Sequence, residues 1–101
     1  MVYLDNCATT LIKPDCVYEE VMRVMKENGG NAGRGGHSMS VLAADVIYKA
    51  RENVAKLFNI DDESAVCFTY NASHALNYAV KGVLKKGDHV IISSFEHNSV
   101  Y

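Results

Sequence analysis

Apolar side chains recur at steps of three and four residues along three stretches of the chain. This spacing gathers them on one helix face, so it predicts amphipathic helices over 15–27, 39–58 and 74–84. Asn28 and Asn59, which tolerate left-handed backbone, are expected to end the first two helices. The second helix would bury a stripe of Leu42, Val46, Ala50, Val54 and Leu57, and the third would turn inward Ala75, Leu76, Ala79, Val80, Val83 and Leu84.

Two shorter stretches, 65–69 and 89–93, are apolar without alternation, which is typical of strands covered on both faces. A strand, an 11-residue helix and a second strand within about 30 residues form a parallel βαβ unit with a right-handed crossover. Cys67 lies inside the first run and is expected to be a buried small hydrophobe. The prediction is therefore an α/β fold, in which two helices and an extended N-terminal arm (1–13) precede the βαβ unit within 14–101.

Loops 70–73 and 94–99 follow the two predicted strands. In open α/β sheets, ligands bind beyond the carboxyl ends of the strands, so both loops are candidate site elements. Ala72 and Ser73 stand at the start of the predicted third helix, where unpaired N–H groups and the helix dipole favour a phosphate. The alternative is ordinary capping of that helix by Asn71 or Ser73.

Composition narrows the class of protein. The 101 residues allow one small domain, and 49% hydrophobic with 22% charged residues is typical of a soluble globular chain. A net charge of −2 gives no basic footprint for nucleic acid. No apolar run is long enough for a membrane span, and the start lacks a signal-peptide pattern, so we expect a cytoplasmic protein.

The cysteines and histidines offer few independent chemical signals. Three cysteines without CxxC spacing make a disulfide framework or a zinc site unexpected, and no metal is predicted. Cys7 has no base near it in sequence and is not expected to be a nucleophile. A lone histidine such as His97 is more often a surface or packed residue than a catalytic one.

Four sequence blocks, in this order, resemble the opening of a cysteine desulfurase of the class V aminotransferase family, pyridoxal-phosphate enzymes of fold type I. They are YLDNCATT at 3–10, GRGGHSMS at 33–40, FTYNAS at 68–73 and EHNSV at 96–100. The resemblance covers nearly the whole chain. Family members run to several hundred residues, so the resemblance implies an amino-terminal part of the large, cofactor-binding domain.

The resemblance also implies roles for particular residues. The block at 69–73 corresponds to the loop that binds the cofactor phosphate, which assigns this role to Ala72 and Ser73. His97 corresponds to the catalytic histidine that stacks on the pyridine ring, a task that a flat, titratable imidazole suits. Substrate-side contacts are implied for Asn6, Arg34 and His37. Two positions depart from the family pattern, His74 for glutamate and Cys7 for alanine.

As a member of this family, the whole enzyme would take sulfur from L-cysteine, leaving L-alanine and an enzyme persulfide, and would be a homodimer. The seven lysines lie on predicted helices or turns, none in the Ser-x-His-Lys setting, so the Schiff-base lysine is expected outside this chain. Residues 1–101 alone would then be inactive, with the rest of the enzyme as partner. Two alternatives within the family are a selenocysteine lyase and a class V aminotransferase. The others are a non-catalytic α/β anion-binding module and a structural piece whose sheet edges pair with the rest of its own enzyme.

Overall fold

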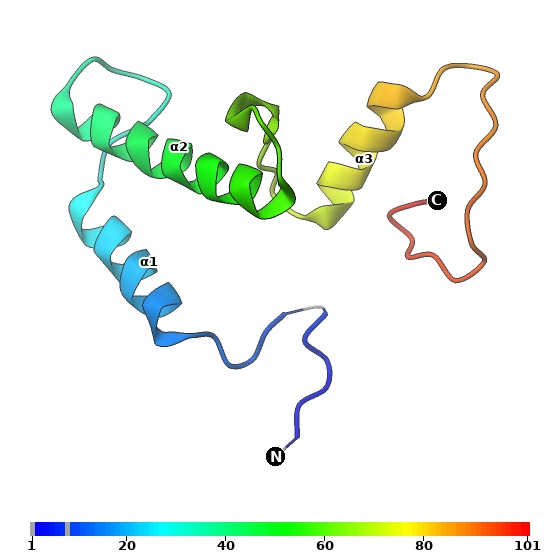
Figure 1. The fold of residues 1–101 in the computed structure, drawn as a ribbon, viewed down its shortest axis with the longest axis horizontal. Helices are drawn as coiled ribbons and strands as arrows, with labels where there is room; N and C mark the ends of the chain where they lie inside the picture. Colours follow the sequence, from blue (N-terminus) through cyan, green and yellow to red (C-terminus); the bar gives the residue numbers. More distant parts are fainter. Residues whose placement is uncertain (1, 8) are drawn as a thin grey trace.

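Three α-helices and one short 3₁₀ turn make up the regular structure of the protein (Figure 1). The computed structural model describes residues 2–7 and 9–101. The elements are α1 (Asp15–Glu27), α2 (Ser38–Phe58), η1 (Glu63–Ala65) and α3 (Ala72–Val83). The three helices predicted from the apolar spacing are confirmed, with ends that differ by no more than two residues.

The start of α2 is fixed by close contacts with the glycine-rich loop before it. Ser40 is buried, with 2% of its surface exposed, and its Oγ lies 2.7 Å from the carbonyl oxygen of Gly35 and 2.8 Å from that of His37. His37 is the N-cap residue but makes no side-chain capping bond. A Cβ on Gly30 would stand 2.3 Å from the carbonyl oxygen of Met39, so only glycine fits there. Ser40 therefore ties the loop to the helix through its first turn.

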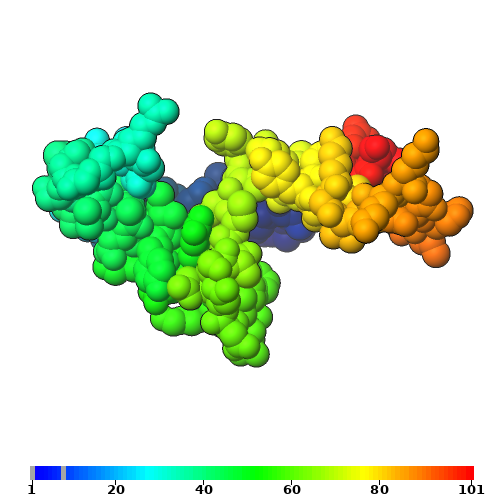
Figure 2. Space-filling model, turned by 90° about the horizontal axis from the view of Figure 1, so that it is seen from above, coloured from blue at the N-terminus to red at the C-terminus, as the bar shows by residue number. Residues whose placement is uncertain are grey.

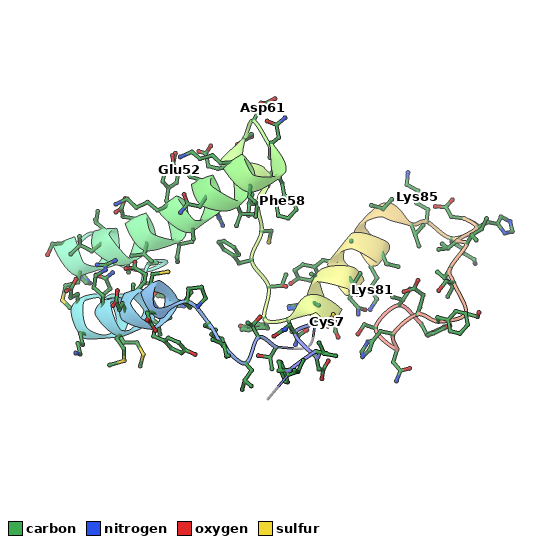
Figure 3. All side chains as sticks on the ribbon, turned by 60° about the horizontal axis from the view of Figure 1, so that its bottom comes forward. Cys7, Glu52, Phe58, Asp61, Lys81 and Lys85 are labelled. Atoms are coloured by element: carbon green, nitrogen blue, oxygen red, sulfur yellow. The ribbon has the colours of Figure 1, made fainter. Side chains whose placement is uncertain are left out.

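The end of α2 is a left-handed cap that turns the chain back along the helix. Asn59 has φ 54°, and the N–H of Ile60 donates to the carbonyl oxygen of Ala55 at 2.8 Å, which is the Schellman arrangement. The returning chain forms η1, and the Tyr48 hydroxyl donates to Glu63 Oε1 at 2.9 Å. Figure 3 labels Phe58 at the end of α2 and Asp61 in the turn to η1.

Only this corner of the described chain contains a core. Ala55 and Val66 are its buried apolar residues, with 4% and 8% of their surfaces exposed. Cys67, beside Val66, is exposed, so the prediction that it is buried is wrong. The chain passes Val66 on its way from η1 to α3, and nothing covers the side of the segment on which Cys67 lies.

The predicted βαβ unit is not present in the structure. Residues 66–69 and 89–93 contain no strand, and the same holds for the rest of the chain at 2–7 and 9–101. A strand is stabilised by the ladder of hydrogen bonds to a neighbour, and the two segments do not pair with each other. Ile91 and Phe95 are almost fully exposed, so the second apolar run lacks the cover on both faces that its composition predicts.

The arrangement of the elements is open. The radius of gyration is 17.8 Å, against about 13 Å for a compact domain of this length. The exposed surface is 9010 Å², whereas a compact protein of this mass exposes about 5,700 Å². Viewed from above, the space-filling model separates into arms rather than one rounded body (Figure 2). The predicted inward faces of α2 and α3 are therefore only partly covered, because no second layer packs on them.

Candidate functional site

The first turn of α3 leaves part of its backbone free to bind a ligand. Asn71 is the N-cap residue, and its side-chain oxygen accepts the N–H of His74 at 2.9 Å. The predicted alternative role of Asn71 as a cap is thus confirmed. The N–H groups of Ala72 and Ser73 donate to no acceptor within the described residues. Capping by Asn71 and binding of an anion by the next two N–H groups are compatible, because they use different donors.

The loop after residue 93 folds on itself around His97. The N–H of Ser99 donates to His97 Nδ1 at 3.1 Å, and the N–H of Val100 donates to the His97 carbonyl oxygen at 2.9 Å. Ser99 Oγ lies 2.8 Å from the same Nδ1. These bonds fix the imidazole ring against the backbone of its own turn and leave Nε2 unengaged within the described chain.

A hydrogen bond between the Ser73 and Ser99 hydroxyls joins this turn to α3. The structure therefore brings together three of the predicted site residues, Ala72, Ser73 and His97, with Ser99 between Ser73 and His97. Ser73 and His97 are exposed, and Ser99 is half-buried. In Figure 1 the chain leaves the last turn of α3 and makes a wide excursion. The C-terminal residues of the chain then return to lie beside α3. The site faces solvent on the described chain.

Aromatic rings cover the flank of α3 next to this site. His74 stacks on Tyr70 with ring centroids 5.7 Å apart and contacts Tyr78 at 4.4 Å. A pocket of about 350 Å³ on this flank is lined by Ser73, His74, Asn77, Tyr78 and Lys81. Lys81, labelled in Figure 3, lies about 12 Å along the helix axis from Ser73, since each residue rises about 1.5 Å. It shares the pocket with Ser73 without adjoining the free N–H groups.

Two of the three predicted substrate-side residues, Arg34 and His37, do not reach this site. Arg34 and His37 lie on the glycine-rich loop at the start of α2, whereas α3 follows the other end of that helix (Figure 1). Twenty-one residues of α2, about 30 Å of helix, separate the two regions. Asn6 lies on the N-terminal arm, where its amide contacts the Tyr3 carbonyl oxygen at 3.5 Å.

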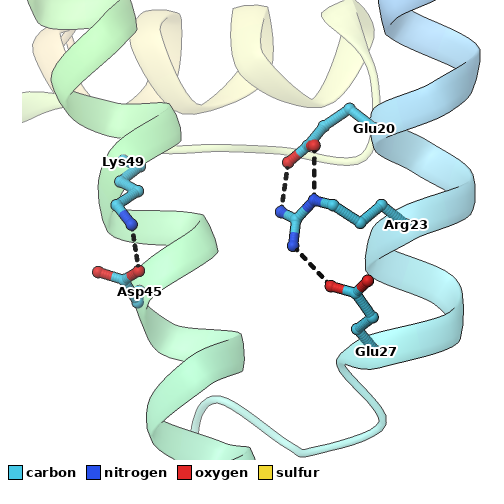
Figure 4. A network of polar contacts seen from close by, with 5 residues as sticks. All are labelled: Glu20, Arg23, Glu27, Asp45 and Lys49. Carbon is cyan, nitrogen blue, oxygen red and sulfur yellow. Dashed lines mark hydrogen bonds and ion pairs between the residues drawn. The ribbon is translucent and has the colours of Figure 1, made fainter.

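A second concave region, of about 650 Å³, lies between α1 and α2. Its walls are apolar side chains, and charged side chains form its rim. The two helices are not in close contact, because no Cα of α1 lies within 8 Å of a Cα of α2. On the rim, Arg23 bridges Glu20 at 2.6 Å and Glu27 at 3.0 Å, and Lys49 pairs with Asp45 at 2.6 Å (Figure 4). The Arg23 hydrogen bonds lower the pKa of Glu20, while Glu20 and Glu27 raise the pKa of Arg23. These exposed pairs offset most of the charge on the rim, where three carboxylates meet two cations.

Neither a metal centre nor a membrane span emerges from the described residues. No group of three or more His, Cys, Asp or Glu side chains in 2–7 and 9–101 is arranged to hold a metal ion. None of the helices found in that part is both long enough and apolar enough to cross a bilayer. Cys7, Cys16 and Cys67 are free thiols at the surface.

Ser99 is the site residue that sequence reasoning did not single out. Its position two residues after His97 is the available signal, because a side-chain acceptor followed by an N–H two residues on closes a local turn. The bond to Ser73 carries no such signal, since it spans 26 residues and depends on how the chain returns to α3.

Comparison with known proteins places these features in a family. The model of the family "Aminotransferase class-V" matches residues 2–101. A "Probable cysteine desulfurase" from Synechocystis is 37% identical over 98% of this chain and 24% of its own length. A "Probable cysteine desulfurase" from Vibrio cholerae is 34% identical over 98% of this chain and 25% of its own length. "Cysteine desulfurase IscS" from Clostridium botulinum is 37% identical over 98% of this chain and 25% of its own length.

The chain thus spans about a quarter of the length of the curated relatives it matches. No solved structure matches it with comparable significance. Since the family model covers nearly every residue, including Ser73 and His97, the chain belongs to the class V aminotransferase family.

Proposed function

We propose that this chain is the cofactor-binding opening of a pyridoxal-phosphate-dependent cysteine desulfurase, which converts L-cysteine to L-alanine and passes the sulfur to an enzyme persulfide. The observation that carries the proposal is the junction of Ser73, Ser99 and His97, which unites the two blocks of the chain that carry the cofactor signature. The three relatives compared above are all named cysteine desulfurases, which supports this reaction over selenocysteine cleavage or transamination.

The residues at the start of α3 fit a phosphate group. Two N–H donors, those of Ala72 and Ser73, are free of acceptors in the described chain, and the Ser73 hydroxyl stands beside them. A phosphate dianion accepts hydrogen bonds and is stabilised by the positive end of the helix dipole. Asn71 holds the turn in shape by capping His74, so the donors are ordered before the ligand arrives.

His97 would orient the cofactor ring and serve the proton transfers. Its imidazole is held at Nδ1 by Ser99, which leaves the ring face and Nε2 available. When bound, pyridoxal phosphate supplies an electron sink for the substrate's Cα. No described lysine hydrogen-bonds to Ser73, Ser99 or His97, and Lys81 follows Ser73 by two turns of α3, so we assign the lysine that anchors the cofactor to another part of the enzyme.

The remaining assignments depend on the fold of the whole enzyme. We propose that residues 65–69 and 89–93 become parallel strands of the large-domain sheet of fold type I, within a domain that begins at residue 14 after the 1–13 arm. The exposed apolar side chains of these two segments support this, because strand partners and helices packed on a sheet would cover them. We further propose a cytoplasmic homodimer in which Asn6, Arg34 and His37 contact the amino-acid substrate.

The test is cofactor binding and activity in the complete enzyme. The wild-type protein is expected to bind pyridoxal phosphate and to release equal amounts of alanine and transferable sulfur from L-cysteine. Ser73→Ala should weaken cofactor binding about 10–150-fold, because a hydrogen bond to a charged group contributes about 1.5–3 kcal/mol. An unchanged dissociation constant would show that the phosphate lies elsewhere. Preference for selenocysteine, or amino transfer to a keto acid, would favour the related reactions instead.

A further inference from the structure

Ser99 occupies the centre of a short polar chain. Its hydroxyl contacts the Ser73 hydroxyl on one side and lies 2.8 Å from His97 Nδ1 on the other. A serine hydroxyl carries a single proton, so Ser99 can donate to only one of these two neighbours at a time. If Ser99 donates to His97 it must accept from Ser73, and if it donates to Ser73 it cannot donate to His97. The two hydrogen bonds therefore change direction together.

The backbone fixes one end of this chain. The Ser99 N–H donates to His97 Nδ1 at 3.1 Å, and a peptide N–H cannot accept a hydrogen bond. Nδ1 must therefore present its lone pair, which places the ring proton on Nε2. A Ser99 hydroxyl that donates to Nδ1 and accepts from Ser73 satisfies both contacts. The reverse direction would leave the Ser99 oxygen and the Nδ1 lone pair facing each other.

An anion at the start of α3 would reverse this direction. A phosphate dianion only accepts, so Ser73 would give its one proton to the anion and could no longer donate to Ser99. Ser99 would keep its contact with Ser73 by donating to it, and its hydroxyl would then leave Nδ1. His97 would then be held at Nδ1 by the backbone N–H of Ser99 alone.

We propose that Ser99 is a positioning residue that couples occupancy of the phosphate site to the hydrogen bonding of His97. The inference rests on the proposed function, since it takes the start of α3 as the phosphate site. It adds that the imidazole is released from one of its two Nδ1 contacts when the phosphate is seated. The cofactor ring would therefore contact a His97 side chain whose hydrogen bonding at Nδ1 has changed because the phosphate of the same cofactor is bound at Ser73.

A double-mutant cycle on cofactor affinity tests the coupling in the complete enzyme. Because seating the phosphate breaks the bond from the Ser99 hydroxyl to Nδ1 in the wild type, Ser99→Ala has no such bond to lose and should lower the dissociation constant of pyridoxal phosphate about 2–10-fold. Ser73→Ala/Ser99→Ala should match Ser73→Ala within about twofold, because Ser99 acts through Ser73. Ser99→Thr should keep wild-type affinity. Ser94→Ala, which removes an exposed hydroxyl of the same loop, is the matched control and should change nothing.

Effects of Ser73→Ala and Ser99→Ala on affinity that multiply in the double variant would overturn the coupling while leaving the phosphate site intact. If Ser73→Ala has no effect on affinity, the phosphate site itself is wrong, and the proposed function loses its main support.

Nitrogen-15 NMR of His97 provides a readout without catalysis. In the cofactor-free complete enzyme, titration with inorganic phosphate should shift the Nδ1 resonance of His97 together with the amides of Ala72 and Ser73. In Ser99→Ala the amides should still respond and the phosphate-dependent shift of Nδ1 should be lost. Pyridoxal without its phosphate should not reproduce the wild-type shift. An Nδ1 response that persists in Ser99→Ala, or amides that ignore phosphate, would refute the proposal.

Discussion

The hydroxyl groups of Ser73 and Ser99 share a hydrogen bond across 26 residues of sequence. The first lies in the opening turn of α3 and the second in the turn that holds His97. This bond brings the proposed phosphate donors and the proposed catalytic imidazole into one site, even though the segments proposed to become strands, 65–69 and 89–93, do not pair with each other in the structure. Substitutions along this junction should therefore separate binding of the cofactor from chemistry.

Replacing His97 with alanine should damage chemistry more than cofactor binding. Removal of a positioned acid–base group lowers turnover on the order of 10²–10⁴-fold, whereas the phosphate donors at α3 remain in place. Steady-state alanine release and cofactor titration in the complete enzyme measure the two effects separately. His89→Ala removes an exposed imidazole from the chain before this loop and should leave both values near wild type. A loss of affinity as large as the loss of turnover would show that His97 mainly holds the cofactor.

The polypeptide of residues 1–101, supplied with pyridoxal phosphate, should not release sulfide from L-cysteine. None of its described lysines hydrogen-bonds to Ser73, Ser99 or His97, and Lys81, which lines the same pocket as Ser73, follows it by two turns of α3, so we expect the anchoring amine to come from elsewhere. The measurement compares sulfide production with that of free cofactor in buffer. Activity clearly above this background would falsify the assignment of the anchoring lysine to another part of the enzyme.

Gly30→Ala should destabilise the junction between the glycine-rich loop and α2. The added Cβ would meet the backbone of Met39 at 2.3–2.4 Å, too close for any adjustment of a side chain to relieve. Overpacking of this kind costs about 1–3 kcal/mol, which chemical unfolding of the complete enzyme would detect. Gly36→Ala is the matched control, because its Cβ would meet no atom within 4 Å. Equal stability of the two variants would mean that the loop moves freely away from Met39.

The pairing of Tyr48 with Glu63 should make the attachment of η1 to α2 sensitive to alkaline pH. The hydrogen bond to the Glu63 carboxylate, and then its negative charge, raise the pKa of Tyr48 above its ordinary value of 10.0. A raised pKa in the folded state means that the contribution is fully present below pH 10 and is lost as the pH rises through the folded value. Tyr48→Phe should therefore lower stability at pH 8, and it should no longer do so once the phenol has ionised, because the phenolate is repelled by the Glu63 carboxylate.

Carbon-13 NMR of labelled tyrosine follows this ionisation directly. Glu63→Gln keeps an acceptor but removes the charge, so it should move the pKa of Tyr48 back toward 10. Tyr18→Phe removes a phenol from α1 and should leave the Tyr48 titration unchanged. A Tyr48 titration that is indifferent to Glu63→Gln would contradict the contact seen in the structure.

The sequence predicted the elements that depend on local interactions and missed those that need distant partners. The helices follow from apolar spacing and from end signals such as Asn59, all contained within a few residues. The runs at 65–69 and 89–93 become strands only when neighbours supply hydrogen bonds, and the described chain provides none. Apolar composition alone therefore predicted burial for Cys67 that the structure does not show.

The candidate site shows the same contrast between local interactions and those that need distant partners. Ser73 and His97 were predicted to lie at one end of a shared sheet, and they do lie together, but through Ser99 rather than through paired strands. Ser40 holds the Gly35 carbonyl, and the spacing of apolar residues gave no sign of this role because it depends on how the loop folds back. Arg34 and His37 were grouped with the site by family resemblance, and bringing them near Ser73 requires packing that α2 alone does not provide.

The uncovered segment that contains Ile91, with 99% of its surface exposed, has a consequence for synthesis of the protein. Short, uncharged runs of β-branched residues such as 90–92 are prone to aggregate by cross-β pairing when several chains are near one another. During translation this run leaves the ribosome before any later segment can shield it. We therefore expect these residues to bind chaperones that recognise extended apolar peptides, and a charged substitution such as Ile91→Lys to increase the soluble yield of residues 1–101 on their own.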